Sequence, residues 1–341
     1  MNSKQRCLAT LAGEPADRTP VFPLLMFFAA DRAGISYREY AGDGSALAQA
    51  QLRARERFGV DAITACSDAF RVAADLGAEM AYPEDKPPYA VRPLVTGRGD
   101  LPRLRRLDPT AKGSRMADRL KAIAEMSGAA GEECLVLGWV DMPFAEACSA
   151  CGVSEFMMML TDAPGLAHAI LEALTLTVID FGVAQAKAGA HLVGAGDAAA
   201  SMISPQMYRE FALPYERRIA EAVHEAGGLM KLHICGNTSA LLEDMVRSEC
   251  DLFNVDHMVD FEKARDVFTA AGKSYKGNLD PVADMLQASP EQCRERCLDR
   301  LAKAAGTRFM LSAGCEIPAG VTDEVFQAFC DAPREFAGGA R

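Results

Sequence analysis

Long apolar segments and an excess of basic residues are both missing from this chain of 341 residues. The longest uninterrupted apolar run, residues 21–30, contains a proline and is too short to cross a bilayer. Lys and Arg number 36 against 47 Asp and Glu, a net charge of −11 that argues against nucleic acid or an anionic membrane as a partner. The first residues also lack the apolar stretch of a secretory signal. We therefore expect a cytoplasmic protein with neither nucleic-acid nor membrane partners.

Tryptophan occurs once and histidine five times, whereas cysteine is frequent, with 11 residues. In a reducing compartment these thiols stay reduced, so a pair of them is more readily a metal-ligand set than a disulfide. Cys148 and Cys151 have the C-x-x-C spacing of redox motifs, but no second such pair accompanies them and an apolar helical pattern follows. We interpret these two as buried structural thiols.

Short apolar runs alternate with helical patterns along the chain. The runs predict eight strands, at residues 21–27, 60–65, 134–140, 191–194, 229–234, 252–255, 274–277 and 309–312. The intervening patterns predict helices at residues 45–57, 116–127, 163–188, 205–226, 239–248, 260–269, 290–305 and 322–336. Strand-then-helix units without hairpin signals predict an α/β fold, one (β/α)8 barrel of the TIM type over residues 1–341. Residues 68–113, rich in proline and charge, are predicted to form an excursion over the barrel mouth after the second strand.

Three residues form a candidate zinc site. His233 and Cys235 lie in K-L-H-I-C-G-N-T after the fifth predicted strand, and Cys315 lies in M-L-S-A-G-C-E-I-P after the eighth. In such barrels the C-terminal ends of all strands meet on one face, so the three side chains should converge there. One imidazole and two thiolates suit Zn²⁺ and leave one tetrahedral position open, as in catalytic sites. The alternative is that the thiols are only small apolar core groups.

Other residues follow the remaining strands toward the same face. Asp68 and Asp197 are candidate catalytic carboxylates, because an unpaired buried carboxylate is costly without a function. The residues that we expect to line a pocket at this face are Met26, Phe27, Trp139, Asp256 and Asn278. For two of them the sequence leaves a structural alternative open: Asp256 as a helix cap and Trp139 as a core side chain.

Five segments carry a resemblance to a known family. They read R-C-L-A-T-L-A-G-E-P-A-D-R-T-P-V, E-R-F-G-V-D-A-I, S-D-A-F-R-V-A-A-D-L-G-A-E-M, I-S-P-Q-M-Y-R-E-F-A-L-P-Y and K-G-N-L-D-P-V, and they are spread over nearly the whole chain. The sequence resembles the uroporphyrinogen decarboxylase superfamily, which has a (β/α)8 fold. Two branches of this superfamily matter here: the porphyrinogen decarboxylases, and the corrinoid-dependent methyltransferases similar to methylcobamide:coenzyme M methyltransferases.

The resemblance is closer to the methyltransferase branch. A decarboxylase of this family holds a polycarboxylate with an arginine-rich mouth, but here the corresponding segment, L-L-M-F-F-A-A-D-R-A-G-I-S, has Arg32 as its only base. The tyrosine of the decarboxylases is absent from M-P-F-A-E-A-C-S, and S-A-G-C-E stands where they have N-L-G-H-G. The His-x-Cys…Cys pattern of the methyltransferases implies His233, Cys235 and Cys315 as zinc ligands, with Asp68 and Asp197 as pocket carboxylates.

The resemblance also implies a reaction. Zinc with two thiolates suits a substrate thiol, so we expect methyl transfer between a corrinoid (cobalamin) and a small molecule, with a thiol-type acceptor favoured. The reverse direction, an O-demethylase-type transfer from a methoxylated aromatic compound to Co(I) corrinoid, is the alternative; uroporphyrinogen decarboxylation is the least favoured. No D-x-H-x-x-G motif is present, so the corrinoid is expected on a partner protein. A non-catalytic corrinoid-protein binding or repair module would not need an open metal position.

Overall fold

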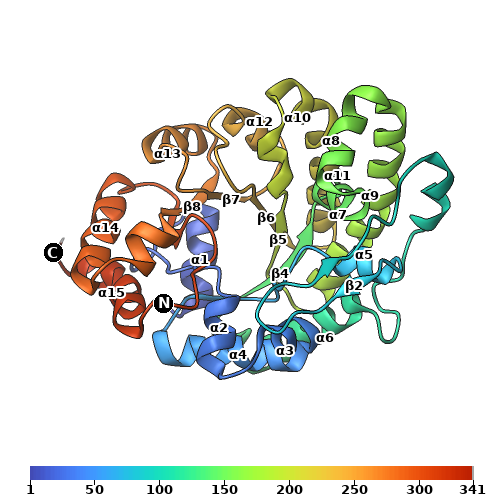
Figure 1. The fold of residues 1–341 in the computed structure, drawn as a ribbon. Coiled ribbons are helices and arrows are strands. Elements are labelled where there is room, and N and C mark those ends of the chain that lie inside the picture. The colour runs from blue at the N-terminus through green and yellow to red at the C-terminus, as the bar shows by residue number, and fades with distance from the viewer. Residues whose placement is uncertain (340–341) are drawn as a thin grey trace.

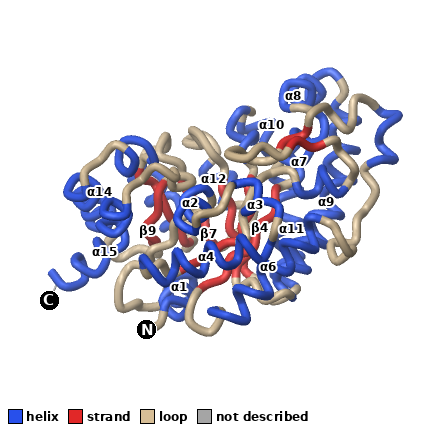
Figure 2. The backbone as a smooth tube through the Cα atoms, turned by 60° about the horizontal axis from the view of Figure 1, so that its bottom comes forward, coloured by secondary structure: helices blue, strands red, loops and turns tan. Residues whose placement is uncertain are grey.

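Seven parallel strands form a curled sheet at the centre of the molecule, with helices around its outside (Figures 1 and 2). The computed structural model describes residues 1–339. The strands lie in the order β1 (Ala62–Thr64), β4 (Leu135–Asp141), β5 (Leu192–Gly196), β6 (Leu229–His233), β7 (Leu252–Val255), β8 (Ser274–Leu279) and β9 (Phe309–Ala313). Almost every strand residue is buried, because helices cover the outer face and side chains fill the inner one. The fold is α/β and consistent with a TIM-type barrel.

The predicted first strand, residues 21–27, is not a strand. Val21 and Leu24 form only isolated parallel bridges, to Leu311 and Glu316, and the carbonyl of Val21 accepts a hydrogen bond of 2.9 Å from the amide of Asp61. Pro20 and Pro23 supply no N–H group to a ladder, which explains the irregular backbone. Residues 20–24 therefore lie between β1 and β9 and contact both edges of the seven-stranded sheet. The other seven predicted strands are present, with ends shifted by a few residues.

The predicted helices are present with one clear difference. They are α4 (Gly44–Phe58), α6 (Arg115–Ala130), α9 (Pro164–Lys187), α10 (Pro205–Phe211), α11 (Leu213–Glu225), α12 (Leu242–Val246), α13 (Phe261–Ala270), α14 (Pro290–Lys303) and α15 (Asp323–Gly339). The helix predicted over residues 205–226 is divided into α10 and α11, because Pro214 lacks the N–H that a continuous helix would need. Further helices are α1 (Ser3–Ala12), α2 (Phe27–Ala33), α3 (Tyr37–Gly42), α7 (Pro143–Cys151) and α8 (Val153–Asp162).

Residues 68–113 contain only short elements. These are α5 (Arg71–Asp75), a two-stranded antiparallel sheet of β2 (Met80–Ala81) and β3 (Tyr89–Ala90), and the 3-10 helix η1 (Arg98–Arg103). This small sheet is separate from the central one. That the segment covers the barrel mouth stays a prediction.

One described helix, α9, is long and apolar enough to cross a membrane by length and composition alone. Half of its most apolar 18-residue window is buried, and the helix packs against α7, α11 and β4. Core helices of proteins without membrane spans have the same character. The cytoplasmic location stays a prediction.

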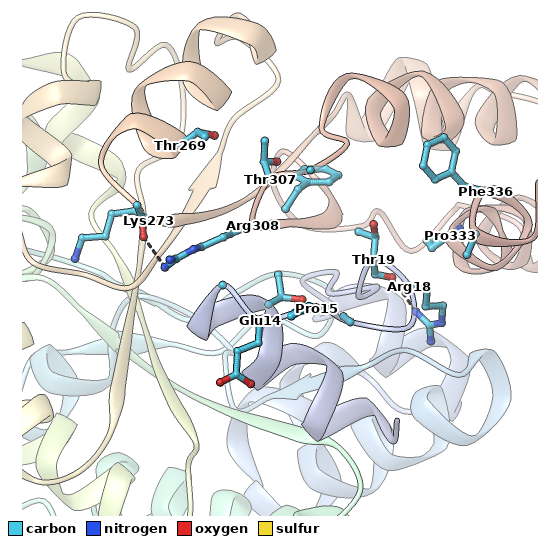
Figure 3. A pocket seen from close by; sticks show the side chains of 17 residues that line it. Glu14, Pro15, Arg18, Thr19, Thr269, Lys273, Thr307, Arg308, Pro333 and Phe336 are labelled. Carbon is cyan, nitrogen blue, oxygen red and sulfur yellow. Dashed lines mark hydrogen bonds between the residues drawn. The ribbon is translucent and has the colours of Figure 1, made fainter. Parts of the chain in front are cut away.

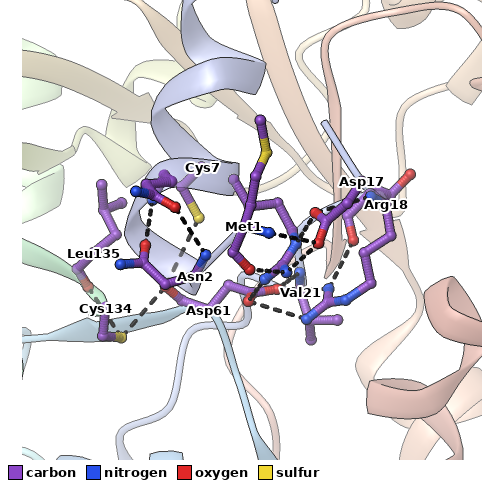
Figure 4. A network of polar contacts seen from close by, with 12 residues as sticks. Met1, Asn2, Cys7, Asp17, Arg18, Val21, Asp61, Cys134 and Leu135 are labelled. Carbon is purple, nitrogen blue, oxygen red and sulfur yellow. Dashed lines mark hydrogen bonds and ion pairs between the residues drawn. The ribbon is translucent and has the colours of Figure 1, made fainter. Parts of the chain in front are cut away.

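A buried ion-pair network joins α1 to the start of β1 (Figure 4). The carboxylate of Asp61, which is 0% exposed, accepts hydrogen bonds of 2.7 Å from Arg6 Nη1, from Arg18 Nη1 and from the amide of Val21. Arg6 also donates to Asp17 at 2.7 and 2.8 Å. This network connects two of the segments that carry the family resemblance, D-R-T-P-V and E-R-F-G-V-D-A-I. Their residues here therefore stabilise the fold.

Candidate metal centre

The three predicted ligands lie together at the C-terminal ends of β6 and β9. His233 ends β6, Cys235 follows it, and Cys315 follows β9; their donor atoms lie within 4.8 Å of one another. Cys235 Sγ lies 3.0 Å from His233 Nε2 and 3.8 Å from Cys315 Sγ. Tetrahedral zinc, with bonds of about 2.3 Å to sulfur and 2.0 Å to nitrogen, separates such donors by about 3.8 Å (S···S) and 3.5 Å (S···N). The cluster therefore fits a zinc ion with a small adjustment of His233; that it binds zinc stays a prediction.

The orientation of His233 suits a ligand. Its Nδ1 lies 3.2 Å from the carbonyl oxygen of Asn254 in β7. A carbonyl can only accept, so Nδ1 carries the proton and the lone pair of Nε2 points at the thiols. Such a hydrogen bond to a backbone carbonyl is the usual way in which a metal-binding histidine is fixed in one tautomer.

Asp256 holds the loop that carries Cys235. Its Oδ2 accepts from the amide of Gly236 at 3.0 Å, and its Oδ1 accepts from the amide of Met258 at 3.0 Å. The carboxylate thus ties the loop after β6 to the loop after β7. Asp256 was predicted to line a pocket; in the structure its carboxylate is buried and occupied with backbone amides.

Asn278, also predicted as a pocket residue, forms hydrogen bonds with the loop that follows β7. Its Nδ2 donates to the carbonyl oxygens of Asp256 at 3.3 Å and Val259 at 2.7 Å, and its Oδ1 accepts from Arg300 Nε at 3.1 Å. Gly314 allows the close approach of the Cys315 loop, because a Cβ there would lie 2.4 Å from the amide nitrogen of His257. The ligand loops are therefore fixed by hydrogen bonds and by close packing.

The two thiols are within hydrogen-bonding distance, so each affects the pKa of the other. The hydrogen bond from Cys235 lowers the pKa of Cys315 to about 3. The same hydrogen bond raises the pKa of Cys235 far above its usual value. Binding of a metal to both sulfurs would release the protons that the thiols carry.

Met26 and Phe27 lie next to the metal cluster in space. The amide of Phe27 donates to Glu316 Oε1 at 2.5 Å, and Glu316 directly follows Cys315. The ring of Phe27 stacks on Tyr37 with centroids 3.7 Å apart. Both predicted pocket residues are partly exposed, and that they line a pocket beside the cluster stays a prediction.

Asp68 is a fully paired anion. Its carboxylate accepts from Arg115 at 2.8 and 2.7 Å and from Ser67 Oγ at 2.7 Å. Burial alone would raise the pKa of Asp68, but the charge and hydrogen bonds of Arg115 outweigh burial and lower it. Asp68 is therefore ionised and held in place; a catalytic role for it stays a prediction.

Asp197 is buried away from solvent. Its amide donates to the carbonyl of His233 at 2.9 Å, but its carboxyl faces Glu216, whose own carboxyl accepts from Tyr208. Burial, followed by the charge of Glu216, raises the pKa of Asp197 well above its usual value; burial raises the pKa of Glu216 to about 7. Both side-chain oxygens of Asp197 are buried without a hydrogen-bond partner. The structure thus separates its carboxyl from solvent, and the catalytic role stays a prediction.

Two buried lysines near the metal cluster were not among the site residues predicted from the sequence. Lys231 in β6 and Lys276 in β8 are 0% and 1% exposed. The Nζ of Lys231 lies 4.3 Å from the ring centroid of Trp139, which is itself buried. Burial lowers the pKa of Lys231 to about 8, and burial, followed by the charge of Lys231, lowers the pKa of Lys276 well below its usual value. The alternation K-x-H in β6 was a usable signal, because it puts Lys231 on the same face as His233.

A cavity of about 570 Å³ opens at the opposite end of the sheet (Figure 3). Its lining includes residues that precede β8 and β9 and residues that follow α1. Arg308 lines it and donates to the carbonyl of Gly272 at 2.7 Å, while Arg18 is bound to Asp61. In barrels of this type the N-terminal face serves stability, and none of the predicted site residues reaches this cavity.

Comparisons with known proteins agree with this architecture. A family model described as uroporphyrinogen decarboxylase (URO-D) matches residues 2–336. A uroporphyrinogen decarboxylase of Nostoc punctiforme is 30% identical over 352 residues, covering 97% of this chain and 96% of the relative. Among solved structures, a methyltransferase from Methanosarcina mazei matches with a TM-score of 0.89 at 22% identity, covering 98% of this chain and 99% of that one. A B12-independent methionine synthase from Shewanella sp. matches with a TM-score of 0.57 at 10% identity, covering 87% of each chain. At these identities the solved structures show the fold alone.

Proposed function

The chain belongs to the uroporphyrinogen decarboxylase (URO-D) family, and within that family we propose that it is a zinc-dependent methyltransferase. It would exchange a methyl group between a corrinoid (cobalamin) on a partner protein and a small molecule, with a thiol as the favoured acceptor. The observation that carries the proposal is the cluster of His233, Cys235 and Cys315, whose donor atoms lie within 4.8 Å of one another. This donor set matches zinc and leaves a position for a substrate.

The chain's own residues would hold and orient the reactants. His233 Nε2 and the two sulfurs would bind the metal, with Asn254 fixing the imidazole and Asp256 fixing the Cys235 loop. Bound zinc would lower the pKa of a substrate thiol, ordinarily about 8.5, so that the thiolate is present at neutral pH. The partly exposed side chains of Met26 and Phe27 offer an apolar surface beside the metal position. That surface also suits a methoxylated aromatic donor, which would transfer its methyl group in the opposite direction.

The absorbance of cobalamin tests the proposal and its direction. With 2-mercaptoethanol as thiol, we expect zinc-loaded protein to convert methylcob(III)alamin to cob(I)alamin: a C–S bond forms, the Co–C bond breaks, and its electron pair stays on cobalt. Conversion of cob(I)alamin to methylcob(III)alamin by a methoxyaromatic compound would instead support the demethylase direction. The control is the Cys235→Ala variant, which lacks one thiolate. If neither conversion occurs, with free cobalamin or with a cognate corrinoid protein, methyl transfer must be abandoned.

Uroporphyrinogen should not be decarboxylated at an enzymatic rate. The curated relatives carry that name, but the mouth segment of this chain has Arg32 as its only base, and Arg32 Nε donates to Asp323 at 2.6 Å. Arg71 and Arg115 also pair with carboxylates, those of Asp141 and Asp68, and are not free to bind a polycarboxylate. Incubation with uroporphyrinogen, followed by chromatography of the oxidised porphyrins, should show no coproporphyrin. Turnover on the order of 1 s⁻¹ or faster would contradict the assignment.

A further inference from the structure

Four large apolar side chains are exposed on the loops around the metal cluster. Met202 and Met258 are 66% and 56% exposed, and Val282 and Leu286 are 46% and 41% exposed. They lie in the segments that follow β5, β7 and β8. Exposed apolar side chains that lie together on a protein surface mark a site for a partner. We refer to these four residues as the apolar arc.

Two loops with an exposed methionine flank the loop after β6, which carries the second predicted ligand. Ser201 belongs to the short helix η2 (Ala198–Met202), and its Oγ lies 3.1 Å from the position that a Cβ at Gly236 would occupy. On the side of β7, the carboxylate of Asp256 accepts hydrogen bonds from the amides of Gly236 and Met258. The ligand loop is therefore in contact with both methionine-bearing loops.

The apolar arc continues along the sheet edge to the loop after β9. His257 Nε2 lies 3.8 Å from Oδ2 of Asp280, which directly precedes the short helix η3 (Pro281–Leu286). A Cβ at Gly320 would lie 3.0 Å from Leu286 Cδ1. Gly320 belongs to the segment after β9 that also carries the third predicted ligand. The arc therefore follows the C-terminal ends of β5 to β9, beside both loops that carry a thiol.

The segments that carry the arc are acidic. Residues 197–204, 254–262 and 278–291 contain no Lys or Arg. Their seven acidic residues are the buried Asp197 and Asp256 and the exposed or partly exposed Asp260, Glu262, Asp280, Asp284 and Glu291. Two bases stand beside them: Lys263 donates to the carbonyl of Ser239, and Arg296 Nε lies 3.5 Å from Asp284. Two copies of this chain would bring like charges together here, whereas a basic partner would be attracted.

We propose that the apolar arc is the docking surface for the protein that carries the corrinoid, and that the matching face of this partner is apolar at its centre and basic at its edge. The inference rests on the proposed function, in which a carried corrinoid must reach the metal position. Methionine side chains are flexible and polarisable, so they adapt to the surface of a partner. The acidic side chains would add to the rate and the specificity of association.

Binding of the cognate corrinoid protein to the zinc-loaded full-length protein tests the apolar part of this surface. In Met202→Lys and in Met258→Lys we expect Kd to rise about tenfold or more, because a lysine would lose its hydration in an apolar contact and would repel a basic partner. Met158→Lys is the matched control, because Met158 is also 56% exposed but lies on α8. It should change Kd less than about twofold. Biolayer interferometry would measure Kd, and atomic emission would confirm an unchanged zinc content.

The charge of the partner is tested in the same way. Glu262→Lys should raise Kd about fivefold, whereas Glu14→Lys should change it less than about twofold, because Glu14 is exposed at the opposite end of the sheet. An increase in NaCl from about 50 to about 300 mM should raise the Kd of the wild type about fivefold or more, because salt screens exposed charges.

An unchanged Kd in both methionine variants overturns the inference alone, and so does a wild-type Kd that does not rise with salt. A wild-type dimer that Met258→Lys dissociates, followed by analytical ultracentrifugation, would identify a second copy as the occupant and also overturn it. A wild type that transfers the methyl group of free cobalamin but binds no corrinoid protein has the same consequence. A wild type that neither transfers a methyl group nor binds the corrinoid protein overturns the proposed function and the inference with it.

Discussion

Replacing Cys315 by alanine should lower the zinc content of the purified protein from about one equivalent to about a tenth or less. Cys235→Ala should have the same effect, because each variant leaves only one thiolate and one imidazole. Methyl transfer should fall with the metal, by about a thousandfold or more, because the remaining donors cannot hold the acceptor. Zinc would be measured by atomic emission after dialysis against metal-free buffer.

A matched control for the zinc experiment is Cys148→Ala. Cys148 is a buried thiol of α7 outside the metal cluster, so its replacement should leave the zinc content unchanged. Circular dichroism should show intact secondary structure in all three variants, since the core does not depend on the metal site. Full zinc retention in both Cys235→Ala and Cys315→Ala would refute the proposed ligand set.

Replacing Asp61 by asparagine should lower the free energy of unfolding by about 3–5 kcal/mol. The carboxylate is 0% exposed and accepts hydrogen bonds from Arg6, Arg18 and the amide of Val21. Its loss leaves guanidinium charge buried without compensation, which costs more than the ion pairs themselves contribute. Urea denaturation followed by circular dichroism would measure the change.

Asp17→Asn is the control for the second prediction, because the side chain of Asp17 binds the same Arg6 but is 42% exposed. Its replacement should lower the free energy of unfolding by about 1 kcal/mol or less, since solvent screens the exposed pair. A decrease of less than about 1 kcal/mol in the free energy of unfolding of Asp61→Asn would contradict the prediction, because it would mean that solvent screens these ion pairs.

The sequence predicted most of the central sheet, and its failures have physical causes. Buried parallel strands are short apolar runs, and seven of the eight predicted ones are present. Residues 21–27 have the same apolar character, but Pro20 and Pro23 prevent regular pairing. Pro214 likewise divides a helix that hydrophobic periodicity alone made continuous. In both places the proline was visible in the sequence, and it outweighed the apolar pattern.

The convergence of the three ligands was predictable, whereas the surroundings of the carboxylates were not. His233, Cys235 and Cys315 follow strands of one parallel sheet, whose C-terminal ends share a face. Asp68 is paired with Arg115, which lies 47 positions away at the start of α6, and Asp197 faces Glu216 in α11. Neither partner has a local pattern that connects it to the aspartate, so only the folded structure shows that one carboxylate is paired and the other is buried.

The segment between β1 and β9 has a consequence for folding during synthesis. Val21 pairs with Leu311, about 290 positions later in the chain, so residues 20–24 have no partner on the β9 side until the ribosome has made nearly the whole protein. At about 5–20 residues per second that interval lasts roughly 15–60 s. Throughout it the nascent chain presents an unpaired sheet edge, the kind of surface on which strands of other chains can add. Chains that terminate before β9 would keep that edge open permanently, so we expect them to aggregate or to be degraded rather than to form a smaller stable barrel.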